Sequence, residues 1–189
     1  MSVPPIVLAS SSPRRRALLA GAGLDYTAVP SATDELHDPS LGMGNLVLAN
    51  ARAKALDVAS AHPNKIVLGA DTLVWLDGRA LGKPGNPSGA REMLNLLSGR
   101  VHEVATGVHL VRLDPLVQVE FVEVTRVRFR QLDLETIKDY LARVDVLDKA
   151  GAYALQEHGD LLVESIEGSR SNVVGLPIER TLAALARHF

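Results

Sequence analysis

The sequence predicts a mixed α/β fold, with helices flanking one β-sheet, from three observations. Apolar runs typical of strands alternate along the chain with segments whose apolar residues recur at helical spacing. Residues 102–113 and 118–130 are long and rich in β-branched side chains, and the short Asp-Pro-Leu that links them indicates an antiparallel pair. Because a doubly wound fold is built on parallel strands, this pair favours a mixed sheet over a purely parallel one.

The N-terminal half alternates strand and helix signals. Pro13 suits the first position of a helix, and Gly21 and Gly23 suit the residues just beyond its end. The Asp77-Gly78 pair favours the tight primed turn of a β-hairpin. In chain order we expect a strand at 6–10, a helix from Pro13, a weaker strand at 24–31, a polar loop at 31–44, a helix at 45–62, and a hairpin with strands at 65–76 and 79–83.

The C-terminal half places helices on either side of the antiparallel pair. Pro87 opens one helix and Gly99 closes it. Asp133 stands near the start of an amphipathic helix. We interpret 171–177 as a loop that anchors the last helix. In chain order we expect a helix at 86–99, strands at 102–113 and 118–130, a helix at 132–144, a loop and then a strand within 150–169, and a final helix entered through Pro177.

The composition is that of a globular protein with one sizeable core. Hydrophobic residues make up 47% of the chain and charged residues 22%, both ordinary values for a folded domain. The length of 189 residues predicts one domain over 1–189, with room for two lobes. The net charge of −2 gives no global reason to expect nucleic acid or an acidic membrane as a partner.

No signal for export or membrane insertion stands out. Residues 1–16 hold a short apolar stretch followed by arginines, the wrong order and length for a signal peptide. No apolar run approaches the ~18 residues of a membrane span. The absence of cysteine excludes disulfides and thiolate metal sites and suits a reducing compartment. We therefore expect a cytoplasmic protein with no membrane partner.

The stretch Ser10-Ser-Ser-Pro-Arg-Arg-Arg16 is a candidate phosphate site. A strand that ends in serines and leads into a helix offers free N–H groups and a positive dipole end, to which arginines add bidentate contacts. The structural alternative is a serine N-cap with a solvated basic first turn, and both interpretations stay open. The stretch is not a Walker loop, because G-x-x-x-x-G-K-[ST] does not occur.

Asp71 is an acid inside an apolar strand, between small neighbours. Burying a bare carboxylate is costly, so this one must be paired, bound to metal or neutral. A core salt bridge or a strand-end cap is the structural alternative to a catalytic role. Glu35, which follows Asp34 in the polar loop, is a possible second acid, although a solvated loop explains that pair as well.

Two further side chains are candidates for substrate contacts. Lys83 stands between Gly82 and Pro84, and a stiffly held lysine reads a phosphate better than a mobile one. Gln156 ends the small-residue stretch that starts at Asp148, and its amide offers donors and an acceptor to a base edge. A surface lysine and an ordinary loop are the alternatives. The histidines show no metal-ligand spacing, and nothing supports a covalent nucleophile.

Taken together, these stretches resemble the Maf family of nucleoside triphosphate pyrophosphatases. Each matching stretch is weak alone, but they lie in the family's order and span nearly the whole chain. They are LASSSPRRRALL, DE at 34–35, LANARAKA, GADTLVWLDGRALGKP, LLSGRVHEVATGV, VRFRQLDLETIKDYL, DKAGAYALQ and NVVGLP.

The resemblance implies a long twisted mixed sheet of the inosine-triphosphatase-like type, with two lobes around a nucleotide cleft and a homodimeric assembly. It implies hydrolysis of a nucleoside triphosphate to monophosphate and pyrophosphate with a divalent cation, Mg²⁺ or Mn²⁺. Pro13-Arg14, Asp71-Thr72 and Lys149 to Gln156 match the branch that acts on dTTP and UTP. Activity on modified uridine triphosphates, and so a role in cleaning the nucleotide pool, is implied as well.

For this reaction we hypothesise roles for single residues. Asp71 is expected to be the general base, held by metal and water rather than by a core salt bridge, and Glu35 is expected to share the cation. The expected triphosphate ligands are Arg14, Lys54 and Lys83, with hydrogen bonds from Ser10 and Ser12. The residues expected to discriminate the base are Thr72, Gln156 and Arg14.

Two alternative functions stay open at this point. A pyrophosphatase for deaminated purine triphosphates, such as ITP and XTP, would share the reaction, but the branch motifs speak against it. A nucleotide-binding regulator of cell division would bind the triphosphate without turning it over. Asp71 together with Lys83 argues for turnover, because a pure sensor need not keep a base.

Overall fold

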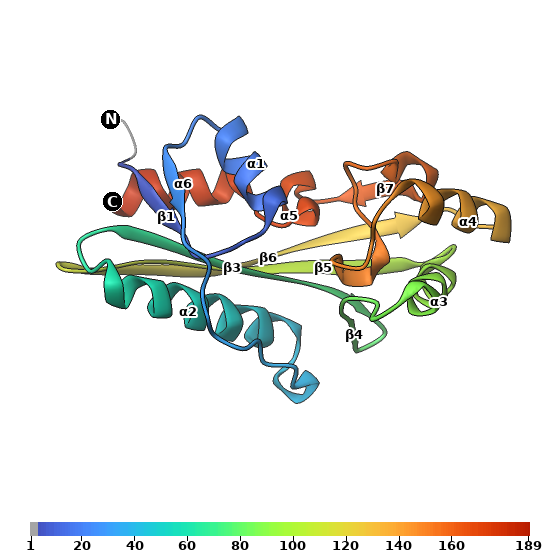
Figure 1. The fold of residues 1–189 in the computed structure, drawn as a ribbon, viewed down its shortest axis with the longest axis horizontal. Coiled ribbons are helices and arrows are strands. Elements are labelled where there is room, and N and C mark those ends of the chain that lie inside the picture. Colours follow the sequence, from blue (N-terminus) through green and yellow to red (C-terminus); the bar gives the residue numbers. More distant parts are fainter. Residues whose placement is uncertain (1–3) are drawn as a thin grey trace.

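The computed structural model describes residues 4–189 and contains one mixed sheet flanked by helices (Figure 1). Its strands are β1 Ile6–Leu8, β2 Tyr26–Ala28, β3 Ile66–Leu76, β4 Arg79–Leu81, β5 Val101–Leu113, β6 Leu116–Phe129 and β7 Val163–Glu167. Their spatial order is β2-β1-β3-β5-β6-β7, with β4 paired to β3. β1 pairs in parallel with β2 and β3, whereas the pairs β3–β5, β5–β6 and β6–β7 are antiparallel. The predicted mixed α/β fold is confirmed.

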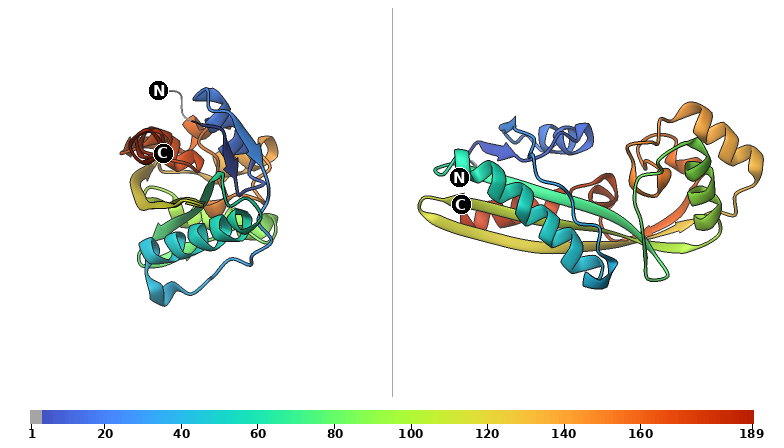
Figure 2. Two further views of the ribbon diagram at one scale, coloured as in Figure 1. Left: turned by 90° about the vertical axis from the view of Figure 1, so that its left-hand side faces the viewer. Right: turned by 60° about the horizontal axis from the view of Figure 1, so that its bottom comes forward.

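The helices are distributed over both faces and both ends of the sheet. They are α1 Pro13–Gly21, α2 Met43–Ala61, α3 Pro87–Leu97, α4 Leu134–Arg143, α5 Arg170–Val174 and α6 Ile178–His188, with short 3₁₀ turns at Pro39–Leu41, Ala150–Ala152 and Gly159–Leu161. α2 runs along one face of the sheet, and α1 and α6 lie over the opposite face (Figures 1 and 2). α3 and α4 gather at the other end of the sheet.

The long strands β3, β5 and β6 extend through two separately packed ends of the molecule. At one end, one apolar cluster joins the sheet to α1 and α6, and another joins it to α2. At the far end a third cluster packs α3 and α4 against the ends of β5 and β6, around Leu94, Phe129 and Tyr140. These clusters form two lobes on one continuous sheet. That the whole range 1–189 behaves as a single domain stays a prediction.

Two strand glycines let α2 lie directly on the sheet. A Cβ at Gly69 in β3 would be 2.2 Å from the carbonyl oxygen of Ala51, and one at Gly107 in β5 would be 2.5 Å from backbone atoms of Val47. No side chain larger than hydrogen fits at such distances. The close approach sets the height of α2 above β3, and α2 carries Lys54.

The elements differ from the prediction in two places. The first strand ends at Leu8 rather than Ser10, because the Ser10 hydroxyl accepts a hydrogen bond from Ser12 N–H and the Ser12 hydroxyl caps α1. Residues 171–177, interpreted as a loop, contain most of the short helix α5, which Ser169 caps through Asn172 N–H. The Asp77-Gly78 turn is primed as predicted, with φ of 48° and 77°.

None of the helices within residues 4–189 is long and apolar enough to cross a bilayer.

Candidate active site

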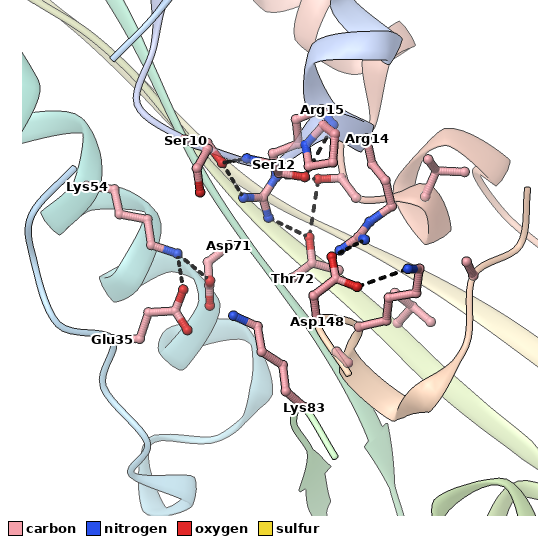
Figure 3. Close-up of a pocket in the computed structure, with 18 of the residues that line it drawn as sticks. Ser10, Ser12, Arg14, Arg15, Glu35, Lys54, Asp71, Thr72, Lys83 and Asp148 are labelled. Carbon is pink, nitrogen blue, oxygen red and sulfur yellow. Dashed lines mark hydrogen bonds and ion pairs between the residues drawn. The ribbon is translucent and has the colours of Figure 1, made fainter. Parts of the chain in front are cut away.

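A cavity of about 340 Å³ opens between the two lobes, where β1, β3 and the start of α1 face the loops of the far end. It brings together all the side chains that the sequence singled out, and Figure 3 labels each of them except Gln156. These are Ser10, Ser12, Arg14, Glu35, Lys54, Asp71, Thr72, Lys83 and Gln156.

Asp71 lies in the middle of β3 with only 4% of its surface exposed, and its carboxylate borders the cavity. Oδ1 accepts a hydrogen bond from Lys54 Nζ at 2.7 Å, and Oδ2 accepts one from Asn50 Nδ2 at 3.0 Å. The expectation that no salt bridge holds this carboxylate is wrong, because a buried carboxylate needs a countercharge and Lys54 provides it. The partner is itself a cavity residue, so the pair belongs to the site.

Lys54 binds a second carboxylate at the same time. Its Nζ lies 2.6 Å from Glu35 Oε1, so one ammonium group stands between Glu35 and Asp71 (Figure 3). Burial acts to raise the pKa of Glu35, but the hydrogen bond and charge of Lys54, aided by the charges of Lys83 and Arg15, lower it below its usual value. Glu35 is therefore ionised at neutral pH.

Asn50 fixes both sides of this arrangement and was missed by the sequence analysis. It lies one helical turn before Lys54, so both side chains project from the same face of α2. Its Oδ1 accepts from Leu36 N–H at 2.7 Å and its Nδ2 donates to Leu36 C=O at 3.1 Å, which holds the loop that carries Glu35. An amide four residues before a lysine in an otherwise apolar helix face is the signal that could have identified it.

Arg15, which the sequence analysis did not single out, is the buried arginine of the site. Its guanidinium donates to Gly175 C=O at 2.9 Å, to Ser10 Oγ at 3.2 Å and to Thr72 Oγ1 at 3.0 Å. Burial lowers the pKa of Arg15, while the negative charge of Asp71 acts against that shift. One side chain thus joins the end of β1, the middle of β3 and the residue after α5.

Arg14 lies at the mouth of the cavity and bridges the two lobes. Its Nη1 lies 3.1 Å from Asp148 Oδ2, and Lys149 Nζ lies 2.9 Å from Oδ1 of the same carboxylate. At this side of the cavity, Gln156 Nε2 donates to Glu157 Oε1 at 3.2 Å. The segment 148–156 therefore presents charged and amide groups opposite the start of α1.

Lys83 reaches the cavity from the loop after β4. Gly82 C=O, just before it, accepts a hydrogen bond from Gly151 N–H at 3.0 Å, which ties this loop to the segment 148–156. Among residues 4–189, Lys83 has no carboxylate within ion-pair distance. Its ammonium is thus available to an anionic ligand.

Two buried tyrosines hold the wall formed by 148–156. Tyr153 lines the cavity, and its hydroxyl lies 2.9 Å from His102 Nε2 on β5. Tyr140 of α4 accepts from Ala154 N–H at 2.9 Å. Burial raises the pKa of Tyr140 to about 12, despite its hydrogen bond to Ala154, so both hydroxyls remain protonated structural groups.

The donor set fits a hard divalent cation. Glu35 and Asp71 direct carboxylate oxygens at a common point, now occupied by the Lys54 ammonium. In the described part of the chain, no group of three or more acidic, histidine or cysteine side chains forms a complete metal site. Mg²⁺ is commonly held by one or two carboxylates together with phosphate oxygens, which suits an open pair of this kind.

Comparison with known proteins identifies the family. The family described as "Maf-like protein" matches residues 5–188. The dTTP/UTP pyrophosphatase of Akkermansia muciniphila is 45% identical over 183 residues, covering 97% of this chain and 96% of that protein. Those of Halalkalibacterium halodurans and Clostridioides difficile are 46% and 42% identical, each over 97% of this chain and at least 95% of the relative.

Among solved structures, a HAM1 protein from Coxiella burnetii aligns with a TM-score of 0.47 and 16% identity, covering 68% of this chain and 73% of that one. This likeness is too low to carry a conclusion. The family match, by contrast, covers almost every residue and includes each segment that lines the cavity. The chain belongs to the Maf-like protein family.

Proposed function

We propose that this protein is a nucleoside triphosphate diphosphatase that hydrolyses dTTP and UTP, and modified uridine triphosphates, to the monophosphate and pyrophosphate. Relatives that are 42–46% identical over nearly the whole chain carry the name dTTP/UTP pyrophosphatase. The observation that carries the proposal is the cavity itself, where an ionisable Asp71 stands among cationic side chains. Such a protein would remove unwanted nucleotides from the pool.

Asp71 acts as the general base in this proposal. Asn50 holds Oδ2 at 3.0 Å, so the carboxylate keeps one orientation at the edge of the cavity, from which it takes the proton of the attacking water. The water attacks the α-phosphorus, and the bond to the bridging oxygen of the leaving pyrophosphate breaks. Arg15 and Thr72 hold the strand beside Asp71 in place.

Cationic and N–H groups of this chain bind the triphosphate. Lys83 reaches the cavity with no ion-pair partner among residues 4–189, Lys54 lines it, and the serines of 10–12 precede the positive end of α1. Fixed cations stabilise the charge that develops on the leaving group. A divalent cation, Mg²⁺ or Mn²⁺, held by Glu35 and Asp71 would supply further neutralisation of the phosphates when bound.

In this proposal the nucleobase of the substrate lies toward the segment 148–156. Gln156 of that segment, together with Arg14 and Thr72, discriminates between nucleobases. A pocket built to hydrogen-bond one base edge rejects others, because its polar groups lose their partners. Tyr153, held by His102, forms the wall that positions this segment. We also propose that the protein works in the cytoplasm and that it is a homodimer. Sedimentation of the purified protein tests the oligomeric state.

The experiment is to mix purified protein and Mg²⁺ with dTTP, UTP, CTP and ITP and to measure pyrophosphate and monophosphate. Turnover of dTTP and UTP well above CTP and ITP is expected. A preference for ITP would support a purine pyrophosphatase instead. Binding of dTTP without pyrophosphate release would support a nucleotide-binding regulator.

A further inference from the structure

The ammonium of Lys54 occupies the point where two acids converge. Glu35 Oε1 and Asp71 Oδ1 lie 2.6 and 2.7 Å from it, and these two side chains are the proposed cation ligands. Asp71 is buried and 11% of the Lys54 side chain is exposed, so little water reaches this pair. In the free protein, the Lys54 ammonium and the Asp71 carboxylate therefore each need the other as a countercharge.

We propose that Lys54 is a place-holder for the divalent cation. In the free protein its ammonium occupies the position between Glu35 and Asp71, and the arriving cation displaces it toward the triphosphate. This inference rests on the proposed function, because it takes Glu35 and Asp71 as the cation's ligands. It assigns to Lys54 two alternative sites within one cavity.

Steric exclusion is the first argument. A Mg²⁺ ion binds carboxylate oxygens at about 2.0–2.1 Å, and the Lys54 nitrogen already lies within 2.7 Å of both. The cation and the Lys54 ammonium are both positive, and they cannot both lie within bonding distance of Glu35 Oε1 and Asp71 Oδ1. The cation can bind Glu35 Oε1 and Asp71 Oδ1 together only after the Lys54 ammonium has left.

The second argument is that the acids are held together without Lys54. Asn50 bonds Asp71 on one side and the backbone of Leu36, next to Glu35, on the other. The Asp71 carboxylate and the backbone beside Glu35 therefore stay in place when the ammonium leaves. The free protein thus has a pair of oxygen donors, from Glu35 and Asp71, with the ammonium of the flexible Lys54 side chain between them.

The third argument concerns where the released ammonium can go. Lys54 lines the same cavity as Lys83 and the start of α1, the groups proposed to contact the triphosphate. A lysine side chain has four methylene groups and can reorient without a change of backbone. Cation binding would then add one positive charge to the phosphate side, so cation and nucleotide each tighten the binding of the other.

The test measures Mn²⁺ binding without nucleotide, by the electron paramagnetic resonance of free Mn²⁺. Lys54→Met is expected to bind Mn²⁺ more tightly than the parent, on the order of tenfold, the usual scale for coupling between two ligands. Lys83→Met is the matched control, because it removes the same charge from the same cavity but not from between the acids. It is expected to change Mn²⁺ affinity about threefold or less. Equal gains in the two variants, or none in Lys54→Met, would overturn the proposal.

A second measurement uses the parent protein and does not depend on a variant folding. Side-chain ¹⁵N resonances of lysine are recorded while Mg²⁺ is added without nucleotide. The Lys54 Nζ signal is expected to shift as its ion pairs break, while that of Lys83 moves little. A Lys54 signal that stays unchanged when Mg²⁺ is bound would overturn the proposal. Neither readout needs turnover, so failure of dTTP hydrolysis would instead contradict the proposed function.

Discussion

Arg15 and Thr72 are 57 positions apart in the sequence, and the guanidinium of one donates to the hydroxyl of the other at 3.0 Å. The same guanidinium bonds Ser10 and Gly175 C=O. Three elements around the cavity thus share one buried side chain. Because Thr72 follows Asp71 in β3, Arg15 helps to set the position of the proposed base.

Arg15→Lys is expected to destabilise the fold by about 1–3 kcal/mol, because an ammonium cannot reproduce three directed hydrogen bonds at a buried position. Arg14→Lys is the control, since that side chain is 23% exposed and has one ion pair with Asp148. Its cost is expected to stay below about 1 kcal/mol. Urea denaturation of both variants measures the difference. If both variants lose the same free energy of unfolding, the hydrogen bonds of Arg15 do not stabilise the contacts between β1, β3 and α5.

Asp71→Asn is expected to fold and to lose on the order of 10²–10⁴ in kcat for dTTP, the usual contribution of a positioned base. The amide oxygen can still accept from Lys54, but the side chain can no longer take a proton. The measurement is steady-state turnover with Mg²⁺, with thermal melting as a check on folding. Near-parental turnover would remove Asp71 from the role of base.

Gln156→Ala is expected to change the ranking of nucleotides more than the maximal rate. The side chain lies at the mouth of the cavity and its amide bonds only Glu157 among the contacts in the described chain. The measurement compares kcat/KM for dTTP, UTP and CTP. Glu157→Ala is a control that frees the amide without removing it. A uniform loss across the three nucleotides would contradict a role in base discrimination.

Much of the fold could be predicted from local pattern, and the misses have physical reasons. Alternation in 118–130 predicted β6, and Asp77-Gly78 predicted the turn after β3. Helix α5 escaped because it has only five residues, too few for a helical period to show. Which face of the sheet α2 covers depends on the glycines of β3 and β5, and no local period reveals that packing.

In the candidate site, too, the sequence predicts which residues take part but not how they pack against one another. The acids and cations could be predicted as members of one cavity, and all of them line it. Their pairing could not be predicted, because Lys54 meets Glu35 and Asp71 only after α2 packs on β3. Likewise the choice between Arg14 and Arg15 depends on which helix face turns inward. Sequence order alone does not distinguish neighbouring arginines in a first turn.

Gly69→Ala is expected to destabilise the protein by about 1–3 kcal/mol or more, through overpacking. The added Cβ would lie 2.2 Å from Ala51 C=O, so α2 must move away from β3. Because α2 carries Asn50 and Lys54, dTTP turnover is expected to fall as well. Gly21→Ala is the control, since its Cβ would meet nothing within 4 Å. Unfolding and turnover of both variants measure the effect, and parental behaviour of Gly69→Ala would contradict it.

His102, which bonds Tyr153 in the wall of the cavity, makes the stability of the protein depend on pH. Burial lowers the pKa of His102 to about 4, and its Nδ1 has no hydrogen-bond partner among the described residues. The unfolded chain takes up a proton near pH 6.5 but the folded chain does not, so stability is lost as pH falls from about 6.5 to 4. At pH 4.5 the loss from this group is about 2–3 kcal/mol.

The test compares urea denaturation at pH 7 and pH 4.5 for the parent and for His102→Gln, whose amide can still bond Tyr153 but does not titrate. The stability difference between the two pH values is expected to shrink by about 2–3 kcal/mol in the variant, because the remaining groups titrate alike in both proteins. His37→Gln, at an exposed position, is expected to behave as the parent does. If His102→Gln loses as much stability at pH 4.5 as the parent, His102 is not the group that couples the wall of the cavity to pH.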